Sequence, residues 1–326
     1  MIDTSKIFKI STQQDFESIA LDIFRFQIEE NPVYSFFCDY LGRTRNNVTS
    51  LTDIPFLPIG FFKSKKVVSS KNIEQAIFSS SGTTGQIASK HYVTDILLYE
   101  KSYLKGFESF YGNVTDYCIL ALLPSYIERS GSSLIFMLDD LIKKSNHPDS
   151  GFYLDEIDVL VKKLIRLDSQ GKKVLLIGVS FALLDLVEKH QLNLKNTIVM
   201  ETGGMKGRRK ELIRKELHDI LKKGFGTKTI HSEYGMTELL SQAYSQGNGI
   251  FKTPPWMKIL IRDTEDPLTQ QEIGKTGGVN VIDLANINSC SFIATQDLGK
   301  KYNDGSFEIL GRFDNSDIRG CNLMVL

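Results

Sequence analysis

Short apolar runs alternate with longer helical segments between residues 94 and 231, and this alternation constrains the fold more than any other feature. The apolar runs are 117–123, 174–179, 197–200 and 228–231. The segments with helical periodicity are 94–110, 132–144, 154–167, 181–190 and 208–222. The pattern predicts an α/β fold with a mostly parallel sheet flanked by helices on both faces. Ligands on such sheets bind beyond the carboxyl ends of the strands.

The two ends of the chain predict other structure. Residues 11–30 read as a helix with a capping arrangement of Thr12 and Asp15, and Pro32 marks its end. From residue 256, Gly, Asn and Asp turns separate short strand candidates at 257–261, 279–283, 292–295 and 307–310. This predicts a smaller antiparallel β subdomain. The expected domains are an α/β core at 1–255, a β-rich closing subdomain at 256–310 and a hinge-like tail at 311–326.

Composition argues against several functional classes. Lys plus Arg and Asp plus Glu both number 39, and the resulting zero net charge disfavours a surface built for nucleic acid or anionic lipid. The four cysteines form no Cys-x-x-Cys pair, so we expect buried reduced thiols in a cytoplasmic protein and no structural zinc. The N-terminus shows no signal peptide, and no apolar run approaches the ~18 residues of a membrane span.

A loop of small residues at 78–85 reads Phe-Ser-Ser-Ser-Gly-Thr-Thr-Gly. Its glycines let the backbone approach a nucleotide, and its hydroxyl and N–H groups can donate to phosphate oxygens. No Gly-Lys-Ser/Thr ends the loop, so it is not a Walker A motif. Taken alone, such a cluster is usually an ordinary polar loop.

Three later segments change that interpretation. They are Glu-Thr-Gly-Gly-Met at 201–205, Tyr-Gly-Met-Thr-Glu at 234–238, and Thr-Gln-Asp-Leu-Gly at 295–299 followed by Gly-Arg-Phe-Asp at 311–314. With the loop, and in this order, they resemble the core motifs of the adenylate-forming enzymes. That superfamily contains acyl-CoA synthetases, peptide-synthetase adenylation domains and luciferases. The first two segments also follow predicted strands, where ligands of a parallel sheet bind.

A closer resemblance rests on longer stretches. They are Ser-Ser-Gly-Thr-Thr-Gly-Gln at 80–86, Glu-Thr-Gly-Gly-Met-Lys-Gly-Arg at 201–208, His-Ser-Glu-Tyr-Gly-Met-Thr-Glu-Leu at 231–239 and Ile-Arg-Gly-Cys-Asn-Leu at 318–323. These resemble the acyl-protein synthetase family, the long-chain-fatty-acid–protein ligases found beside the fatty-acid reductase of bacterial bioluminescence. The resemblance extends from about Pro55 to the C-terminus.

The superfamily resemblance implies a nucleotide site. The residues that would hold the pyrophosphate portion are Ser80, Ser81, Gly82, Thr83, Thr84 and Gly85. The residues that would surround adenine are Gly203, Gly204, Met205 and Tyr234. Glycine permits close backbone approach, and Tyr234 would stack on adenine or line the acyl pocket.

The same resemblance assigns the polar chemistry. Thr237 would contact the α-phosphate, and Glu238 would bind Mg²⁺ because a hard cation takes carboxylate oxygens. Asp297 would accept hydrogen bonds from the ribose hydroxyls, and Arg312 would approach ribose or phosphate. Taken singly, each has an ordinary interpretation: Glu238 as a helix-start acid, Gly203-Gly204 as a turn, Asp297 as a solvated loop residue and Arg312 as a surface charge. We interpret His231 as structural.

The sequence departs from the superfamily pattern at two places. The lysine expected directly after the phosphate loop is displaced to Lys90, behind the four residues 86–89. The chain also ends soon after Asp314, which leaves no room for the small C-terminal domain of ~100 residues that most members carry beyond that hinge. We therefore expect the domain to be absent and a partner to supply the missing surface.

The C-terminal tail contains a candidate acyl acceptor. The fatty-acid–protein ligases are acylated on a cysteine near their C-terminus, and Cys321 lies in Arg-Gly-Cys-Asn at 319–322. A thiolate could attack the acyl-adenylate and form a thioester, and Arg319 could lower the thiol pKa. The alternative is a small packing residue.

These features predict an ATP- and Mg²⁺-dependent ligase. It would convert a carboxylic acid, expected to be a fatty acid, and ATP to acyl-AMP and pyrophosphate, and transfer the acyl group to a protein thiol. The acceptor would be Cys321, a partner reductase or a carrier protein. Two alternatives stay open: a ligase that acylates coenzyme A or carrier phosphopantetheine, and a non-catalytic scaffold with an adenylation fold.

Overall fold

The computed structural model describes residues 3–69, 71–80, 87–124, 131–203 and 212–313. The helices are α1 (Gln13–Glu30), α2 (Pro32–Tyr40), α3 (Phe61–Ser64), α4 (Ile96–Tyr111), α5 (Ser133–Ser145), α6 (Ile157–Ser169), α7 (Ser180–Lys189) and α8 (Arg214–Phe225). Short 3-10 helices are η1 (Thr4–Lys9), η2 (Leu51–Asp53), η3 (Val114–Asp116) and η4 (Leu284–Asn286). None of the described helices is long and apolar enough to cross a membrane.

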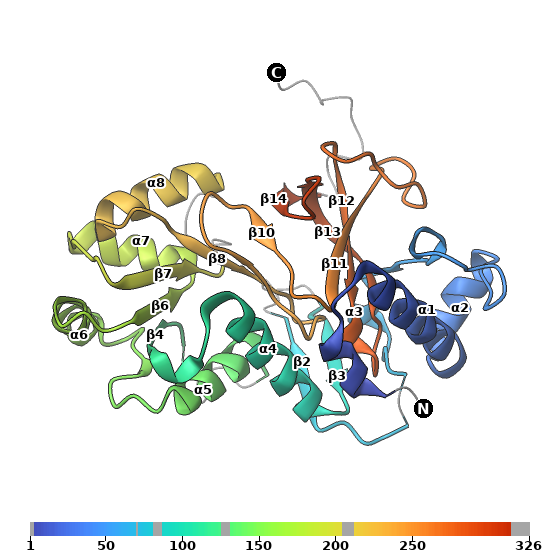
Figure 1. Ribbon diagram of the computed structural model, residues 1–326, viewed down its shortest axis with the longest axis horizontal. Helices are drawn as coiled ribbons and strands as arrows, with labels where there is room; N and C mark the ends of the chain where they lie inside the picture. The colour runs from blue at the N-terminus through green and yellow to red at the C-terminus, as the bar shows by residue number, and fades with distance from the viewer. Residues whose placement is uncertain (1–2, 70, 81–86, 125–130, 204–211, 314–326) are drawn as a thin grey trace.

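The strands form one long sheet and a separate hairpin (Figure 1). The parallel strands, in spatial order, are β5 (Gly151–Phe152), β4 (Cys118–Leu122), β6 (Val174–Gly178), β7 (Thr197–Glu201) and β8 (His231–Tyr234). The antiparallel strands continue from β8 as β9 (Ala243–Ser245), β10 (Phe251–Lys252), β14 (Phe307–Arg312), β13 (Phe292–Lys301), β12 (Thr276–Asp283) and β11 (Met257–Arg262). The hairpin is β2 (Ala76–Ser79) with β3 (Lys90–Val93), and β1 (Leu57–Pro58) pairs in parallel with β13.

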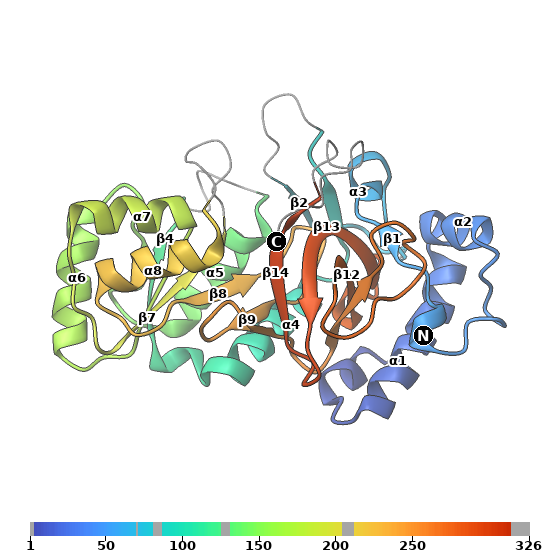
Figure 2. The ribbon, with the colours of Figure 1, turned by 90° about the horizontal axis from the view of Figure 1, so that it is seen from above.

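The parallel strands are buried on both faces. Successive residues of β4 contribute to two different apolar cores: Ile119 packs with the side chains of α4 and α5, whereas Leu120 packs with those of α6, α7 and α8. Leu175 and Leu176 of β6 divide in the same way. The two helical layers lie on opposite sides of the sheet in Figure 2. The predicted α/β architecture, with parallel strands between helices and an antiparallel β part, is confirmed.

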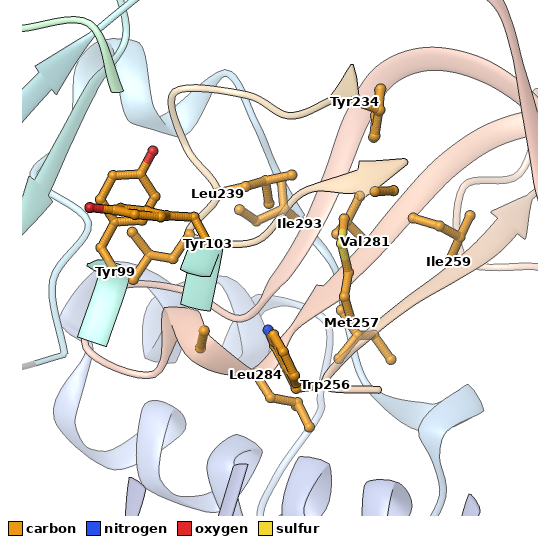
Figure 3. Packing of buried hydrophobic residues seen from close by; sticks show 14 of the residues in the cluster. Tyr99, Tyr103, Tyr234, Leu239, Trp256, Met257, Ile259, Val281, Leu284 and Ile293 are labelled. Atoms are coloured by element: carbon orange, nitrogen blue, oxygen red, sulfur yellow. The ribbon is translucent and has the colours of Figure 1, made fainter. Parts of the chain in front are cut away.

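The first core continues into the antiparallel strands. Figure 3 shows Tyr99 and Tyr103 of α4 on one side, and Met257 and Val281 of β11 and β12 on the other. Trp256 lies between them, and its indole N–H lies 3.1 Å from Ser102 Oγ and 3.0 Å from Ser241 Oγ. A buried indole N–H needs such an acceptor, so this contact fixes where α4 meets the antiparallel strands.

The N-terminal helix begins as its sequence predicts. Thr12 Oγ1 accepts the Asp15 backbone N–H at 3.1 Å, and Asp15 Oδ2 accepts the Thr12 N–H at 3.0 Å, which completes a capping box. The helix ends at Glu30, before Pro32. Pro32 also starts α2, because Asn31 caps that helix and proline fits the first helical position.

Two strands differ most from their predicted bounds. The predicted strand at 228–231 forms instead at His231–Tyr234, although Ser232 and Glu233 are polar and buried. The strand predicted at 292–295 runs on to Lys301, so Asp297 lies in β13 and not in a loop. Pairing with β14 extends it, because Asp297 lies opposite Arg312 in the register. Such pairing between distant segments overrides local strand propensity. The predicted domain boundaries stay predictions.

Candidate nucleotide site

Three of the predicted site residues meet at the carboxyl end of β8. Asp297 is 4% exposed, and its two carboxylate oxygens have different partners. Tyr234 donates its phenolic hydrogen to Oδ2 at 2.7 Å, and the Arg312 Nε donates to Oδ1 at 3.0 Å. The Asp297 N–H also donates to Thr295 Oγ1 at 3.0 Å. The carboxylate is therefore held in one orientation and keeps lone pairs free for another donor.

Tyr234 acts as a donor in this cluster. Burial raises its phenolic pKa well above the ordinary value, and the negative charge of Asp297 raises it further. The ring packs edge-on against both Phe251 and Phe307, with centroids 6.0 and 5.9 Å away. The hydroxyl therefore stays protonated, and the ring is fixed by edge contacts.

Thr237 and Glu238 follow β8 in a turn closed by the Leu239 N–H, which donates to the Met236 carbonyl at 3.1 Å. Two buried residues from other elements hold this turn. His91 Nδ1 of β3 lies 2.8 Å from the Thr237 carbonyl oxygen, and Asn286 Nδ2 of η4 donates to the Glu238 carbonyl at 2.8 Å. His91 Nε2 and Asn286 Oδ1 lie 3.0 Å apart, which joins the two supports. The turn is therefore held through its two backbone carbonyls.

The Glu238 side chain is a carboxyl with little solvent contact, because the residue is only 5% exposed. Burial raises its pKa, while a hydrogen bond from Ser89 and the positive charges of Arg312 and Lys63 act in the opposite direction. A carboxylate in this position favours a further cation. The arrangement therefore fits the predicted contact with a metal ion that is also held by substrate phosphates.

The phosphate-loop candidate starts beside Glu238. The Ser80 N–H donates to the Ser89 carbonyl at 3.1 Å, and the Ser89 N–H donates to Ser80 Oγ at 2.9 Å. These bonds join Ser80 to Ser89, and Ser89 also acts to lower the pKa of the Glu238 carboxyl. Ser80 and Glu238 therefore share Ser89 as a neighbour, and the assignment of Ser80 to phosphate stays a prediction. The other loop residues assigned to phosphate lie outside the described residues: Ser81, Gly82, Thr83, Thr84 and Gly85. Lys90, the displaced lysine, begins β3.

Gly203 lies just beyond the carboxyl end of β7. Its φ of 74° is in the left-handed region, which favours glycine. The Gly203 N–H donates to Glu201 Oε2 at 2.7 Å, and its carbonyl accepts the Ser180 N–H at 2.8 Å. Gly203 is therefore placed by a side chain two residues earlier. Gly204 and Met205, the other predicted adenine contacts, lie outside the described residues.

Glu201 is a functional candidate that the sequence interpretation missed. It is 2% exposed, and Arg214 Nε and His218 Nε2 lie 3.4 and 3.5 Å from its Oε1. Burial alone would raise its pKa, but the His218 hydrogen bond and the Arg214 charge outweigh it and bring the pKa to about 2. Glu201 is the first residue of the Glu-Thr-Gly-Gly-Met motif, and this position was the sequence signal that could have indicated it. Its partners on α8 could not be read from that motif.

Two other groups of residues contribute less to this site. His231 forms a 3.2 Å contact from its Nδ1 to the Tyr111 hydroxyl, and burial lowers its pKa to about 4, in keeping with a structural role. The three described cysteines, Cys38, Cys118 and Cys290, are buried and free. Cys321 lies outside the described residues.

Two further features of this region concern metal-ligating side chains and a groove. Across the described ranges, no three His, Cys, Asp or Glu side chains group closely enough to form a metal cage. A groove of about 560 Å³ lies beside the nucleotide site, between α8, β14 and the turn before β10. Its lining includes Arg214, His218 and Ile309 but neither Tyr234 nor Glu238.

The fold is similar to that of solved adenylate-forming ligases. An open conformation of 2-hydroxyisobutyryl-CoA ligase in complex with 2-HIB-AMP and CoA gives a TM-score of 0.64 at 13% identity, over 93% of this chain and 75% of that one. ATP-bound MatB from Rhodopseudomonas palustris gives a TM-score of 0.54 at 17% identity, over 74% of this chain. The match covers 49% of MatB, about half its length. At these identities the likeness concerns the fold.

A comparison with curated proteins gave no match. The family model described as "Acyl-protein synthetase, LuxE" matches residues 2–326, nearly the whole chain. This match confirms the resemblance carried by the glycine-rich, Glu-Thr-Gly-Gly and Tyr-Gly-Met-Thr-Glu motifs. The chain belongs to the acyl-protein synthetase (LuxE) family.

Proposed function

We propose that this protein activates a fatty acid with ATP to form acyl-AMP, and then transfers the acyl group to a protein thiol. Family membership supports an acyl substrate and a protein acceptor. The fold, similar to ligases solved with ATP or an acyl adenylate, supports the first half-reaction. The proposal takes the fatty chain and the thiol from the family resemblance.

One observation carries the nucleotide part of the proposal. The two carboxyl groups that the resemblance assigns to ribose and metal belong to different strands and turns, yet Arg312 connects them. Its Nε bonds Asp297 at 3.0 Å, and its charge acts on the Glu238 carboxyl. Ser89, which acts to lower the pKa of Glu238, bonds Ser80, the first residue assigned to phosphate. These contacts support a site that spans ribose to phosphate.

In this mechanism the protein mainly positions charge for an in-line attack. The substrate carboxylate oxygen attacks the α-phosphorus of ATP, the α–β phosphoanhydride bond breaks, and pyrophosphate leaves with the electron pair. Asp297 would accept the ribose hydroxyls in an orientation set by Tyr234 and Arg312. Thr237 would donate to the α-phosphate from a turn held by His91 and Asn286. Glu238 would hold Mg²⁺, which offsets the phosphate charge when bound.

In the second half-reaction a thiolate sulfur attacks the acyl carbonyl carbon, and AMP leaves with the electrons of the cleaved carbon–oxygen bond. Cys38, Cys118 and Cys290 do not suit this role, because each is buried at 1% exposure or less. Burial raises the thiol pKa to about 12 for Cys38 and to about 11 for Cys118. We propose Cys321 as the acceptor within the chain, from which a partner reductase or carrier protein would take the acyl group.

The test is carboxylate-dependent ATP–pyrophosphate exchange by the purified chain over fatty, aryl and amino acids. The proposal expects exchange with fatty acids. Exchange with another class of acid alone would overturn the assignment of a fatty acid as the substrate. If no acid supports exchange, adenylation by this chain is overturned and a scaffold is favoured. Coenzyme A, carrier protein and reductase added separately to the acyl-adenylate assay then identify the acceptor. Acylation of coenzyme A alone would contradict a protein thiol.

A further inference from the structure

The carboxylate of Glu201 closes the turn that presents Gly203. Its Oε2 accepts the Gly203 N–H at 2.7 Å and lies 3.3 Å from the Ser180 hydroxyl, while Gly203 holds a left-handed φ of 74°. Glu201 is also the last residue of β7, opposite Ser232 of β8. The position of the turn therefore depends on the orientation of one buried carboxylate.

That carboxylate needs a buried cation, because an isolated charge in an apolar interior is costly. Arg214, in the first turn of α8, places Nε 3.4 Å from Oε1, and His218 one turn later places Nε2 3.5 Å from the same oxygen. His218 Nε2 also lies 3.3 Å from Ser232 Oγ. The network thus has one strong cation, Arg214, and a histidine that is shared with β8.

The same guanidinium contacts the opposite side of the site. Arg214 Nη1 donates to the Ile309 carbonyl of β14 at 2.8 Å, and its central carbon lies 5.0 Å from the centroid of the Phe251 ring. Phe251 stacks on Phe307 of β14 at 5.5 Å, and both rings contact Tyr234 edge-on. Three residues after Ile309, β14 ends at Arg312, which bonds Asp297.

We infer that Arg214 is a positioning residue for nucleotide binding. It ties the Gly203 turn, through Glu201, to the strand that carries Arg312, so the adenine side and the ribose side of the site keep a fixed separation. A planar guanidinium can point Nε and Nη1 at two acceptors at once, whereas a lysine ammonium is a single point charge. The role concerns ATP and rests on the proposed function.

The experiment compares Arg214→Gln, Arg214→Lys and Glu201→Gln with the wild type. Lys215→Gln is the matched control, because it removes the same charge from the next position of α8, which forms neither the Glu201 nor the Ile309 bond in the described structure. Calorimetric binding of ATP without acid gives Kd, exchange kinetics separate KM for ATP from kcat, and thermal unfolding reports stability.

We expect Arg214→Gln and Glu201→Gln to raise Kd and KM for ATP at least tenfold, with KM for the acid unchanged. Arg214→Lys keeps the charge beside Glu201, so it should recover the melting temperature but not the ATP affinity. Lys215→Gln should match the wild type. Normal ATP affinity in Arg214→Gln, or a lysine variant that recovers affinity and stability together, overturns the inference alone. A wild-type chain that binds no ATP overturns the proposed function together with it.

Discussion

Tyr234 donates its phenolic hydrogen to Asp297 at 2.7 Å, and this bond joins the end of β8 to the middle of β13. The two residues lie far apart in the sequence, and neither sequence segment by itself specifies the pairing. Arg312 bonds the other oxygen of the same carboxylate at 3.0 Å. The carboxylate thus has one neutral and one charged donor, and the two together fix its plane.

Asp297→Asn should therefore reduce the exchange kcat/KM for ATP by about 100-fold or more. The amide loses the charge that faces Arg312 and turns an N–H toward one of the two donors. Tyr234→Phe is the matched control, because it keeps the ring and removes one hydrogen bond worth about 1 kcal/mol. It should lower thermal stability slightly and change KM for ATP only a few-fold. Equal losses in both variants would contradict a specific role for the carboxylate.

Glu238→Gln should shift the Mg²⁺ dependence of exchange to concentrations at least tenfold higher. The amide keeps the size of the side chain, while the carboxylate charge that would hold the cation is lost. Burial raises the pKa of Glu238, so removal of its charge should leave stability at neutral pH unchanged or slightly higher. Asp219→Asn, on the exposed part of α8, serves as the control. An unchanged Mg²⁺ titration in Glu238→Gln would remove Glu238 from the metal site.

Acid should weaken the fold through His91. Burial lowers its pKa to about 4, while the hydrogen bond to Thr237 favours the charged form. Between the ordinary value of 6.5 and about 4, the unfolded chain binds more protons than the folded one. Stability should therefore fall as the pH drops through this window, by an amount on the order of 2–3 kcal/mol from this residue.

The variant His91→Gln should reduce the fall in stability between pH 6.5 and 4. It should also slow exchange, because the Thr237 carbonyl loses its contact with His91. The comparison is His231→Gln: burial lowers the His231 pKa to about 4 as well, but His231 contacts Tyr111 and not the turn. The variant His231→Gln should also reduce the fall in stability at acid pH, with little effect on exchange. Urea unfolding from pH 4 to 7 gives the dependence of stability on pH. Equal exchange activities in the two variants would contradict the support of the Thr237 turn by His91.

A rise in pH from about 4.5 to about 8 should weaken the fold through Glu233. Burial and then the charge of Glu201 raise its pKa to about 8, so the folded chain holds a proton that the unfolded chain has lost above about 4.5. Stability should fall as pH rises from about 4.5 and level off above about 8, by on the order of a few kcal/mol. Glu233→Gln should remove this loss of stability with rising pH and leave the opposite contributions of His91 and His231 below about pH 6.5 in place. A slope unchanged by the substitution would show that Glu233 ionises normally.

Some elements of the fold are determined by neighbouring residues, and others by contacts between segments far apart in the sequence. The start of α1 was predictable, because Thr12 and Asp15 supply the capping box within four residues. The buried strands β4 and β6 were also predictable from their continuous apolar runs. By contrast, Asp297 reads as a loop residue, and only pairing with β14 makes it part of a strand.

The candidate site shows the same division. The superfamily resemblance proposed Tyr234, Glu238, Asp297 and Arg312 as candidates, but it could not show that one carboxylate of the set receives both Tyr234 and Arg312. The supporting residues carry no local signal. His91 is an isolated histidine in a short strand, and its contact with the Thr237 carbonyl depends on how the hairpin packs against η4.

The proposed acceptor cysteine and the buried cysteines should differ in their reactivity toward an alkylating reagent. Cys38, Cys118 and Cys290 are buried, and burial raises each thiol pKa, so none should react with iodoacetamide while the chain is folded. We expect one alkylated position, Cys321, in native conditions and four in urea. Mass spectrometry of the digested protein gives the positions, and native labelling at any of the three buried cysteines would contradict their assignment.

The same position should carry the acyl group after incubation with ATP and a fatty acid. The product is expected to be one hydroxylamine-sensitive thioester per chain, lost in Cys321→Ser, with ATP–pyrophosphate exchange retained because adenylation precedes transfer. Cys290→Ser is the matched control, and it should keep the thioester because Cys290 lies in the core with its sulfur 3.4 Å from the Phe292 carbonyl. If Cys321→Ser retains covalent acylation, the acceptor is another group. If it loses exchange as well, the C-terminal segment takes part in adenylation and the two half-reactions are not separable at this residue.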